Sequence, residues 1–281
     1  MERRSPAFTL FIYAAAVLLA VCLILPIFWL FIMSISPAAD LATKPLRWWP
    51  ERIDLSRYQL LLTWAENTTG RNFLSALRNS LTVAVMAVGA ALLVAIPAAW
   101  AVSRQPRIEW SLHLLVMTYM LPPVALAVPL YMGLAALGLL NSIFGLALIY
   151  LSILAPFTTW LLKSGFDAIP RDLEAAAAID GARLDQTLRI VILPLAAPVL
   201  STAALFALLL AWDEFFYALL FTADQRAKTV TVAIADIAGG RIADYGLIAA
   251  AGVLAALPPL LIGVLMQRAI VAGLTGGGVK G

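Results

Sequence analysis

The sequence is poor in the residues that most enzymes use for chemistry. It has one cysteine, Cys22, and one histidine, His113, and only 12% of its 281 residues are charged. A single cysteine excludes a disulfide within the chain and a metal site made of several thiolates. The G-x-x-x-x-G-K-[ST] pattern of a nucleotide-binding loop appears nowhere in the sequence, and the tail "GGGVKG" lacks the Ser or Thr, so we do not expect ATP to bind by that route. We expect no catalytic residue, metal site or cofactor in this chain.

Hydrophobic residues are abundant instead. They make up 63% of the chain, and the mean hydropathy is +0.94. A soluble domain usually has about 45–50% apolar residues, so this composition is typical of a protein embedded in a lipid bilayer. The formal net charge of +3 is too small to indicate binding to nucleic acid.

Long stretches without charge predict the membrane spans, because a helix needs about 20 apolar residues to cross a bilayer. The third and fourth spans share one uncharged stretch between Glu109 and Lys163, with a turn expected at Gly138–Ser142. The first apolar run is longer than the core of a signal peptide, so we expect it to be retained. The predicted spans are 10–33, 78–103, 110–132, 141–163, 196–222 and 245–267, flanked by an N-terminus at 1–9 and a tail at 271–281.

The fold class expected from this pattern is an all-α polytopic membrane protein with six transmembrane helices and both termini on one side. The distribution of lysine and arginine does not say which side that is. Ten of the 19 basic residues would lie on the side of the termini and nine on the other, too even a division for the positive-inside rule.

A more polar segment, 165–195, separates the fourth and fifth spans. Its sequence from Pro170 to Pro194 is "PRDLEAAAAIDGARLDQTLRIVILP". Acidic residues favour a helix start near its beginning, and Gly181 is typical of a helix end. A second amphipathic helix should follow, with Asp185 and Arg189 spaced for an ion pair. Helices this short are marginal in water, so we expect the segment to pack on the membrane surface or on a partner protein.

This stretch resembles the EAA loop of permease subunits in ATP-binding cassette (ABC) importers. That motif runs Glu-Ala-Ala, three residues, Gly, nine residues, a hydrophobic residue, any residue, Leu, Pro. Gly181 is followed at this spacing by "VILP", while the glutamate position is taken by Ala175, with Glu174 one residue earlier. The resemblance implies that Gly181 is the corner of a segment that couples to an ATPase subunit. The implied coupling residues are Glu174, Ala175, Ala176, Ala177, Ala178, Asp180, Gly181, Ala182 and Pro194.

Three further stretches resemble the carbohydrate-uptake branch of these importers, in particular the maltose-type second permease. They are 120–142, the segment "AWDEFFYALLFT" with Asp213 in place of an asparagine, and the tail "AGLTGGGVKG". The resemblance implies a type I ABC importer permease fold in a bacterial or archaeal inner or plasma membrane, with cytoplasmic termini. It also implies that the tail contacts the ATPase through Gly276, Gly277, Gly278 and Lys280.

Asp213 and Glu214 are the only acidic residues inside the predicted spans. A carboxylate near the bilayer centre costs roughly 2.5–3.5 kcal/mol, which favours a polar surrounding. They would line the translocation pathway, hold an external gate, or lie near enough to the surface to face solvent. The remaining candidates for the pathway or gate are Trp212 and the paired prolines Pro122 and Pro123, which should bend a helix.

The resemblance implies a subunit that forms half of the pathway for a di- or oligosaccharide or a related polyol. The implied partners are a homologous permease subunit, two ATPase subunits that bind ATP and Mg²⁺, an extracytoplasmic solute-binding protein and membrane lipid. One alternative is an ABC permease for a non-sugar solute. Another is a secondary transporter that couples ions to mid-membrane carboxylates.

Overall fold

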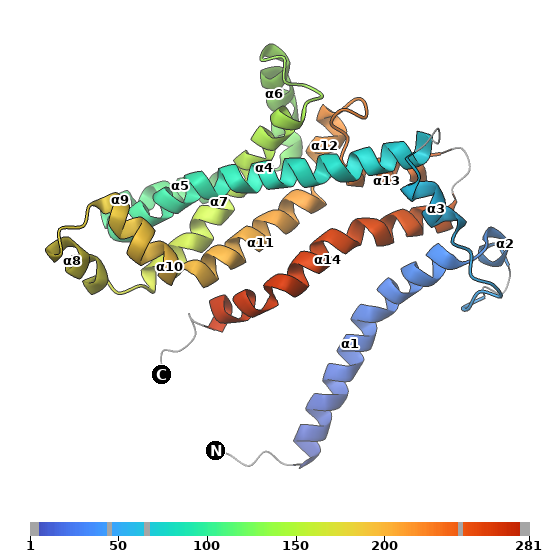
Figure 1. The fold of residues 1–281 in the computed structure, drawn as a ribbon, viewed down its shortest axis with the longest axis horizontal. Helices are drawn as coiled ribbons and strands as arrows, with labels where there is room; N and C mark the ends of the chain where they lie inside the picture. The colour runs from blue at the N-terminus through green and yellow to red at the C-terminus, as the bar shows by residue number, and fades with distance from the viewer. Residues whose placement is uncertain (1–5, 44–46, 65–67, 241–243, 276–281) are drawn as a thin grey trace. The chain divides into compact units, whose positions relative to one another are not determined.

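Helices and short connections make up the part of the chain that the computed structural model describes, which is residues 6–43, 47–64, 68–240 and 244–275. The first eight elements are α1 (Pro6–Ile35), α2 (Ala38–Leu41), α3 (Ser56–Leu62), α4 (Thr68–Arg104), η1 (Pro106–Ile108), α5 (Glu109–Tyr119), α6 (Pro123–Ala136) and α7 (Ile143–Asp167). The others are α8 (Asp172–Ile179), α9 (Leu184–Gln186), η2 (Thr187–Ile192), α10 (Leu193–Leu195), α11 (Ala197–Asp213), α12 (Phe216–Phe221), α13 (Val230–Ala238) and α14 (Tyr245–Thr275). Figure 1 labels most of them.

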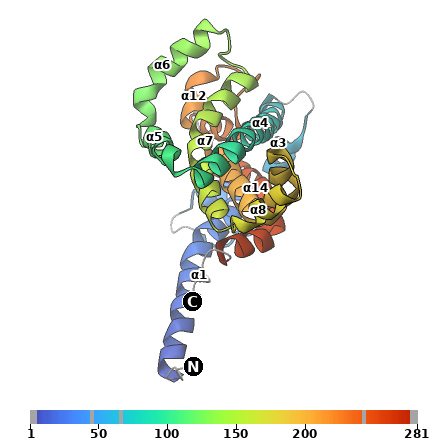
Figure 2. The same cartoon turned by 90° about the vertical axis from the view of Figure 1, so that its left-hand side faces the viewer.

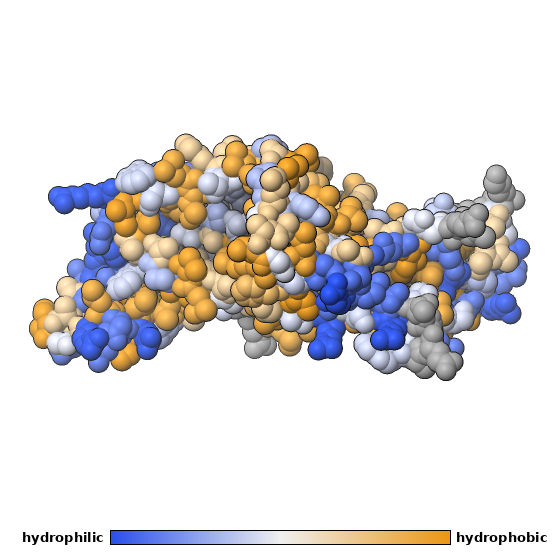
Figure 3. Space-filling model, turned by 90° about the horizontal axis from the view of Figure 1, so that it is seen from above, coloured by the Kyte–Doolittle hydropathy of each residue, from blue (hydrophilic) through white to orange (hydrophobic). Residues whose placement is uncertain are grey.

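Several of these helices are long and apolar enough to cross a membrane. Within the described ranges there are four, in α1, α4, α7 and α14, and two bent helix pairs bring the number to six if each pair is one span. Many large hydrophobic side chains are exposed, and Figure 3 shows them as orange areas on the face that it draws. The expected all-α polytopic membrane fold is confirmed.

The third predicted span, 110–132, is not one continuous helix. α5 ends at Tyr119 and α6 begins at Pro123, and the two helices meet at 95° (Figure 2). Pro122 has extended backbone angles, since a residue that precedes a proline is kept out of the helical region. The proline pair therefore makes a sharp break in the chain, where the sequence predicts a bend within a helix.

The fifth predicted span, 196–222, is also interrupted. α11 ends at Asp213, and α12 begins at Phe216 after an extended Glu214. At its other end α11 continues from α9–α10 through a bend of 79°. Uniform hydrophobicity concealed the break at Glu214, because apolar composition indicates the length of a span but not whether it is straight.

The chain divides into two compact units, residues 1–74 with 234–256 and residues 75–233 with 257–281. In the second unit, α7 packs against α5 and α11, and α4 joins the same core (Figure 1). Small side chains let these helices approach closely. The core includes Val83, Ala84, Ala87 and Ala91 of α4, Leu146, Tyr150 and Leu154 of α7, and Ala207 and Ala211 of α11.

The turn expected at Gly138–Ser142 is present between α6 and α7. Gly138 and Asn141 have positive φ angles of 66° and 53°. Ser142 caps α7 by accepting the N–H of Gly145 at 3.0 Å. The Asn141 side-chain oxygen accepts the N–H groups of Ala223 and Asp224, so this turn holds the loop that follows α12.

In that loop, Asp224 accepts hydrogen bonds from the side chain and the N–H of Arg226. These bonds, with a further one from Asn141, hold the pKa of the Asp224 carboxyl well below its usual range.

In the first unit, Arg57 of α3 joins segments that are distant in the sequence. It is 6% exposed. Its guanidinium donates to the Asp244 carboxylate at 3.1 Å and to the Ser36 carbonyl at 2.5 Å. The Ser34 and Tyr58 hydroxyls share another hydrogen bond of 2.6 Å. These bonds fix α3 both to the end of α1 and to the residue just before α14.

Candidate functional site

The first half of the segment that resembles an EAA loop is a short helix with a glycine stop. Beyond α8, Gly181 has a φ of 80°, and a Cβ there would meet no atom within 4 Å. The Gly181 N–H bonds the Ala178 carbonyl, and the Ala182 N–H bonds the Ala177 carbonyl. This is the Schellman pattern, which requires a left-handed residue after the helix. The backbone conformation at this position therefore favours glycine.

The second half continues through α9, η2 and α10. The middle piece, η2, is a π-helix. Its wider turn changes the spacing of side chains, so residues four apart no longer lie directly above one another. The expected ion pair between Asp185 and Arg189 is therefore wrong. Asp185 pairs instead with Arg183, at 3.1 Å.

Three large apolar side chains of this segment are exposed in the described structure. Ile179 is 86% exposed, Leu184 75% and Ile190 71%. Ala175, Ala176, Ala178, Asp180, Gly181 and Pro194 are also exposed, whereas Glu174, Ala177 and Ala182 are half-buried. We call Ile179, Leu184 and Ile190, with the exposed alanines of α8, the outer face. Glu174 does not belong to it.

Glu174 points back into the second unit. Its Oε1 accepts a hydrogen bond from Nε of Arg104 at 2.6 Å and one from the Trp100 indole N–H at 3.3 Å. The Glu174 side chain is 20% exposed and that of Arg104 14%. Both partners lie in the last two turns of α4. The motif did not identify them, because the contacts join residues about 70 positions apart.

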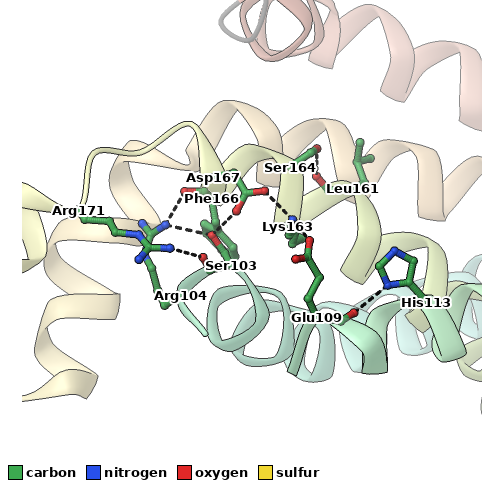
Figure 4. A network of polar contacts seen from close by, with 10 residues as sticks. All are labelled: Ser103, Arg104, Glu109, His113, Leu161, Lys163, Ser164, Phe166, Asp167 and Arg171. Carbon is green, nitrogen blue, oxygen red and sulfur yellow. Dashed lines mark hydrogen bonds and ion pairs between the residues drawn. The ribbon is translucent and has the colours of Figure 1, made fainter. Parts of the chain in front are cut away.

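Other polar contacts continue from this pair (Figure 4). Arg104 donates to the carbonyls of Phe166 and Ile169, at the end of α7, and Arg171 donates to the Ser103 carbonyl. The remaining contacts are Ser103 to Asp167 at 2.6 Å, Lys163 to Asp167 at 2.9 Å and Lys163 to Glu109 at 2.8 Å. The network joins the ends of α4 and α7, the start of α5 and the entrance to α8.

The two acidic residues of the fifth predicted span have different surroundings. Glu214 accepts the N–H groups of Tyr217 at 2.8 Å and Ala218 at 3.1 Å, and so caps α12. Its own carbonyl accepts the hydroxyl of Thr231. Asp213 is exposed and borders a cavity of about 320 Å³, which is lined by Phe206, Leu209, Leu210, Asp213 and Glu214.

The other candidates for the pathway or gate do not line that cavity. Trp212 is buried, with 8% of its surface exposed. Pro122 and Pro123 are exposed at the break between α5 and α6, where the Tyr217 hydroxyl reaches the Pro123 carbonyl at 3.4 Å. The tail residues Gly276, Gly277, Gly278 and Lys280 lie outside the described residues. Across the described ranges, His, Cys, Asp and Glu side chains form no cluster of three or more suited to a metal ion.

Comparison with known proteins agrees with the predicted resemblance. Residues 91–276 match the family described as binding-protein-dependent transport system inner membrane component. The chain is 35% identical to a sulfoquinovosyl glycerol transport permease of Agrobacterium fabrum, over 96% of this chain and 93% of the relative. It is 34% identical to a trehalose/maltose transport permease of Thermococcus litoralis, over 95% of both chains.

The fold has a solved counterpart. A chain from a bacterial ABC transporter that imports the acidic polysaccharide alginate superposes with a TM-score of 0.77 and 24% identity, over 95% of this chain and 99% of that one. The expected ABC importer permease fold is confirmed. The helical architecture, the family match and these relatives agree. The chain therefore belongs to the inner membrane components of binding-protein-dependent transport systems, which are the permease subunits of ABC importers.

Proposed function

We propose that this protein forms half of the translocation pathway for a carbohydrate, a di- or oligosaccharide or a related polyol. A homologous permease subunit would form the other half. Two ATPase subunits would bind ATP and Mg²⁺, and an extracytoplasmic binding protein would deliver the substrate. The relatives named for sulfoquinovosyl glycerol and for trehalose and maltose support a carbohydrate, because they match over nearly the whole chain.

The exposed residues of the outer face support the proposal that α8–α10 couple to an ATPase subunit. Ile179 shares a side of α8 with the exposed Ala175 and Ala176. Leu184 and Ile190 add two large exposed aliphatic side chains on α9 and η2. Each Å² of apolar surface removed from water stabilises a complex by about 25 cal/mol. Covering this surface would therefore stabilise the complex with a partner. The small alanines would let its backbone approach closely.

The coupling would work through alternating access. ATP binding would close the ATPase dimer and move α8, with the Schellman turn at Gly181 keeping the corner fixed. The connected spans would then pass from an inward-open to an outward-open arrangement, biased by the partners. In this orientation α8 and both termini face the cytoplasm, and the tail residues Gly276, Gly277, Gly278 and Lys280 make a second contact with the ATPase.

Asp213 is the better candidate for a substrate contact. Its exposed carboxylate borders the cavity beside Phe206, and ionised carboxylates accept hydrogen bonds from sugar hydroxyl groups. The carboxylate of Glu214 is already occupied by two backbone N–H groups. No lysine or arginine lies in the interior of a predicted span, which disfavours a phosphorylated substrate. A non-sugar, uncharged solute is the second candidate for this pathway.

Uptake into liposomes tests the proposal. The chain would be purified together with its partner permease, ATPase and binding protein and reconstituted, and uptake of radiolabelled trehalose, maltose and other oligosaccharides would be measured. We expect uptake that requires internal ATP and the binding protein. Uptake by this chain alone, driven by an ion gradient, would contradict the proposal and support a secondary transporter.

A further inference from the structure

We propose that Glu174 and Arg104 form a clasp that fixes α8 to the end of α4, so that Glu174 acts as a positioning residue within this chain and does not touch the ATPase subunit. The clasp comprises Glu174, Arg104 and Trp100, with the parallel bond from Arg171 to the Ser103 carbonyl. This inference rests on the proposed coupling function and names the residues that would transmit it.

Arg104 joins three segments at once. Its Nε donates to Glu174 of α8 at 2.6 Å, and its two terminal nitrogens donate to the carbonyls of Phe166 at 3.0 Å and Ile169 at 3.3 Å. The planar guanidinium fork can hold several acceptors in fixed directions. Because both charged side chains are largely buried, solvent screens this pair much less than an exposed one.

The first turn of α8 is bonded to α4 at two points, and the bonds run in both directions. Glu174 accepts from Trp100 and Arg104, which are four residues apart on one face of α4. Arg171, just before α8, donates to the Ser103 carbonyl at 3.1 Å. Two opposed connections resist sliding as well as rotation, so a displacement of α8 would carry the end of α4 with it.

The same helix presents a different side to a partner. Successive helical residues are about 100° apart, so Ala175 does not lie on the side of α8 from which Glu174 reaches the clasp. Ala175, Ala176 and Ile179 are all exposed. The residue at the motif's glutamate position is thus an exposed alanine, and the acidic residue beside it is engaged with α4. The outer face offers a partner apolar surface where the motif would offer a carboxylate.

A double-mutant cycle on the reconstituted complex tests the clasp. The variants are Glu174→Gln, Arg104→Met and the two combined, with Trp100→Phe as a milder change that removes only the indole N–H. Asp172→Asn is the matched control, since it neutralises an exposed carboxylate in the same turn of α8. The readouts are the ATPase retained on purification and the ATP hydrolysed per sugar imported.

We expect both single variants to retain the ATPase subunits and to raise the ATP hydrolysed per sugar by about 2- to 30-fold, the range of coupling changes from single substitutions. The double variant should be no worse than the poorer single variant, because each removes the same connection. Trp100→Phe should show a smaller increase in the same direction, and Asp172→Asn should match the wild type. Simple loss of folded protein would lower yield without changing this ratio.

Two results would overturn the clasp. If Glu174→Gln releases the ATPase subunits, or if its effect simply adds to that of Arg104→Met, then Glu174 contacts the partner directly. If Glu174→Gln and Trp100→Phe leave the ATP hydrolysed per sugar imported unchanged, the clasp does not transmit the movement of α8 to α4. The proposed function fails separately, when the wild-type chain neither binds ATPase subunits nor supports ATP-dependent uptake.

Discussion

Asp213 and Glu214 are adjacent in the sequence, yet the Glu214 carboxylate accepts the backbone N–H groups of Tyr217 and Ala218, whereas Asp213 is exposed and lines a cavity. The break between α11 and α12 separates their roles. Glu214 belongs to the scaffold that starts α12, whereas the carboxylate of Asp213 is exposed and is the substrate contact that we propose.

We therefore expect neutralising these residues to have different effects. Asp213→Asn should reduce sugar uptake and leave the melting temperature unchanged. Glu214→Ala should lower the free energy of unfolding by about 0.5–2 kcal/mol, the usual cost of losing a helix cap. Thermal unfolding in detergent measures the change in stability, and a liposome assay measures the change in sugar uptake. Equal loss of stability in both variants would contradict this division of roles.

Gly181 provides a test of the corner after α8. Its φ of 80° costs a residue with a Cβ roughly 1–2 kcal/mol, and no neighbouring atom would clash. Gly181→Val should uncouple ATP hydrolysis from uptake while the protein remains in the membrane. Gly181→Asn should retain most coupling, because asparagine tolerates this conformation. If valine and asparagine behave alike, the backbone conformation is not what matters.

A close approach between α7 and α11 predicts a large effect on stability. A Cβ on Gly165 would meet the side chain of Val199 at less than 3 Å. Gly165→Leu should lower the free energy of unfolding by about 1–3 kcal/mol through overpacking. Gly89→Leu on α4 is the control, since Gly89 is exposed and a Cβ there meets nothing within 4 Å. Thermal unfolding of the purified chain should separate the two variants.

Arg57 should stabilise the first unit. Its bonds to Asp244 and to the Ser36 carbonyl involve a charged donor, and each such bond is worth about 1.5–3 kcal/mol. Arg57→Met should lower the melting temperature, whereas Arg52→Met, at an exposed position, should not. Asp244→Asn should have a smaller effect than Arg57→Met, since Asp244 is 42% exposed. A stable Arg57→Met protein would show that these bonds are dispensable.

Local signals made parts of this structure predictable. The Gly138–Ser142 turn and the helix end near Gly181 follow from residues whose backbone preferences act within a few positions. The length of the apolar stretches and the apolar composition were enough to predict an all-α membrane protein. The prolines at 122 and 123 also marked a break, although its angle of 95° depends on what α6 packs against.

Contacts between distant residues were not predictable in this way. Arg104 directly follows the predicted span 78–103, and its pairing with Glu174 depends on how α4 and α8 pack together. The break at Glu214 was hidden because a carboxylate that caps a helix and one that lines a pathway look the same in a sequence. The π-helix η2 likewise has no strong sequence signal.

We propose that the outer face couples sugar import to ATP hydrolysis by a partner. A substitution of Ile179 tests this most directly, because Ile179 is 86% exposed. The measurement is ATPase activity of the complete transporter in nanodiscs, with and without sugar-loaded binding protein. We predict that sugar-loaded binding protein stimulates the wild type and Ile179→Leu, and that Ile179→Asp loses this stimulation together with bound ATPase subunit. Full stimulation of Ile179→Asp would contradict the account.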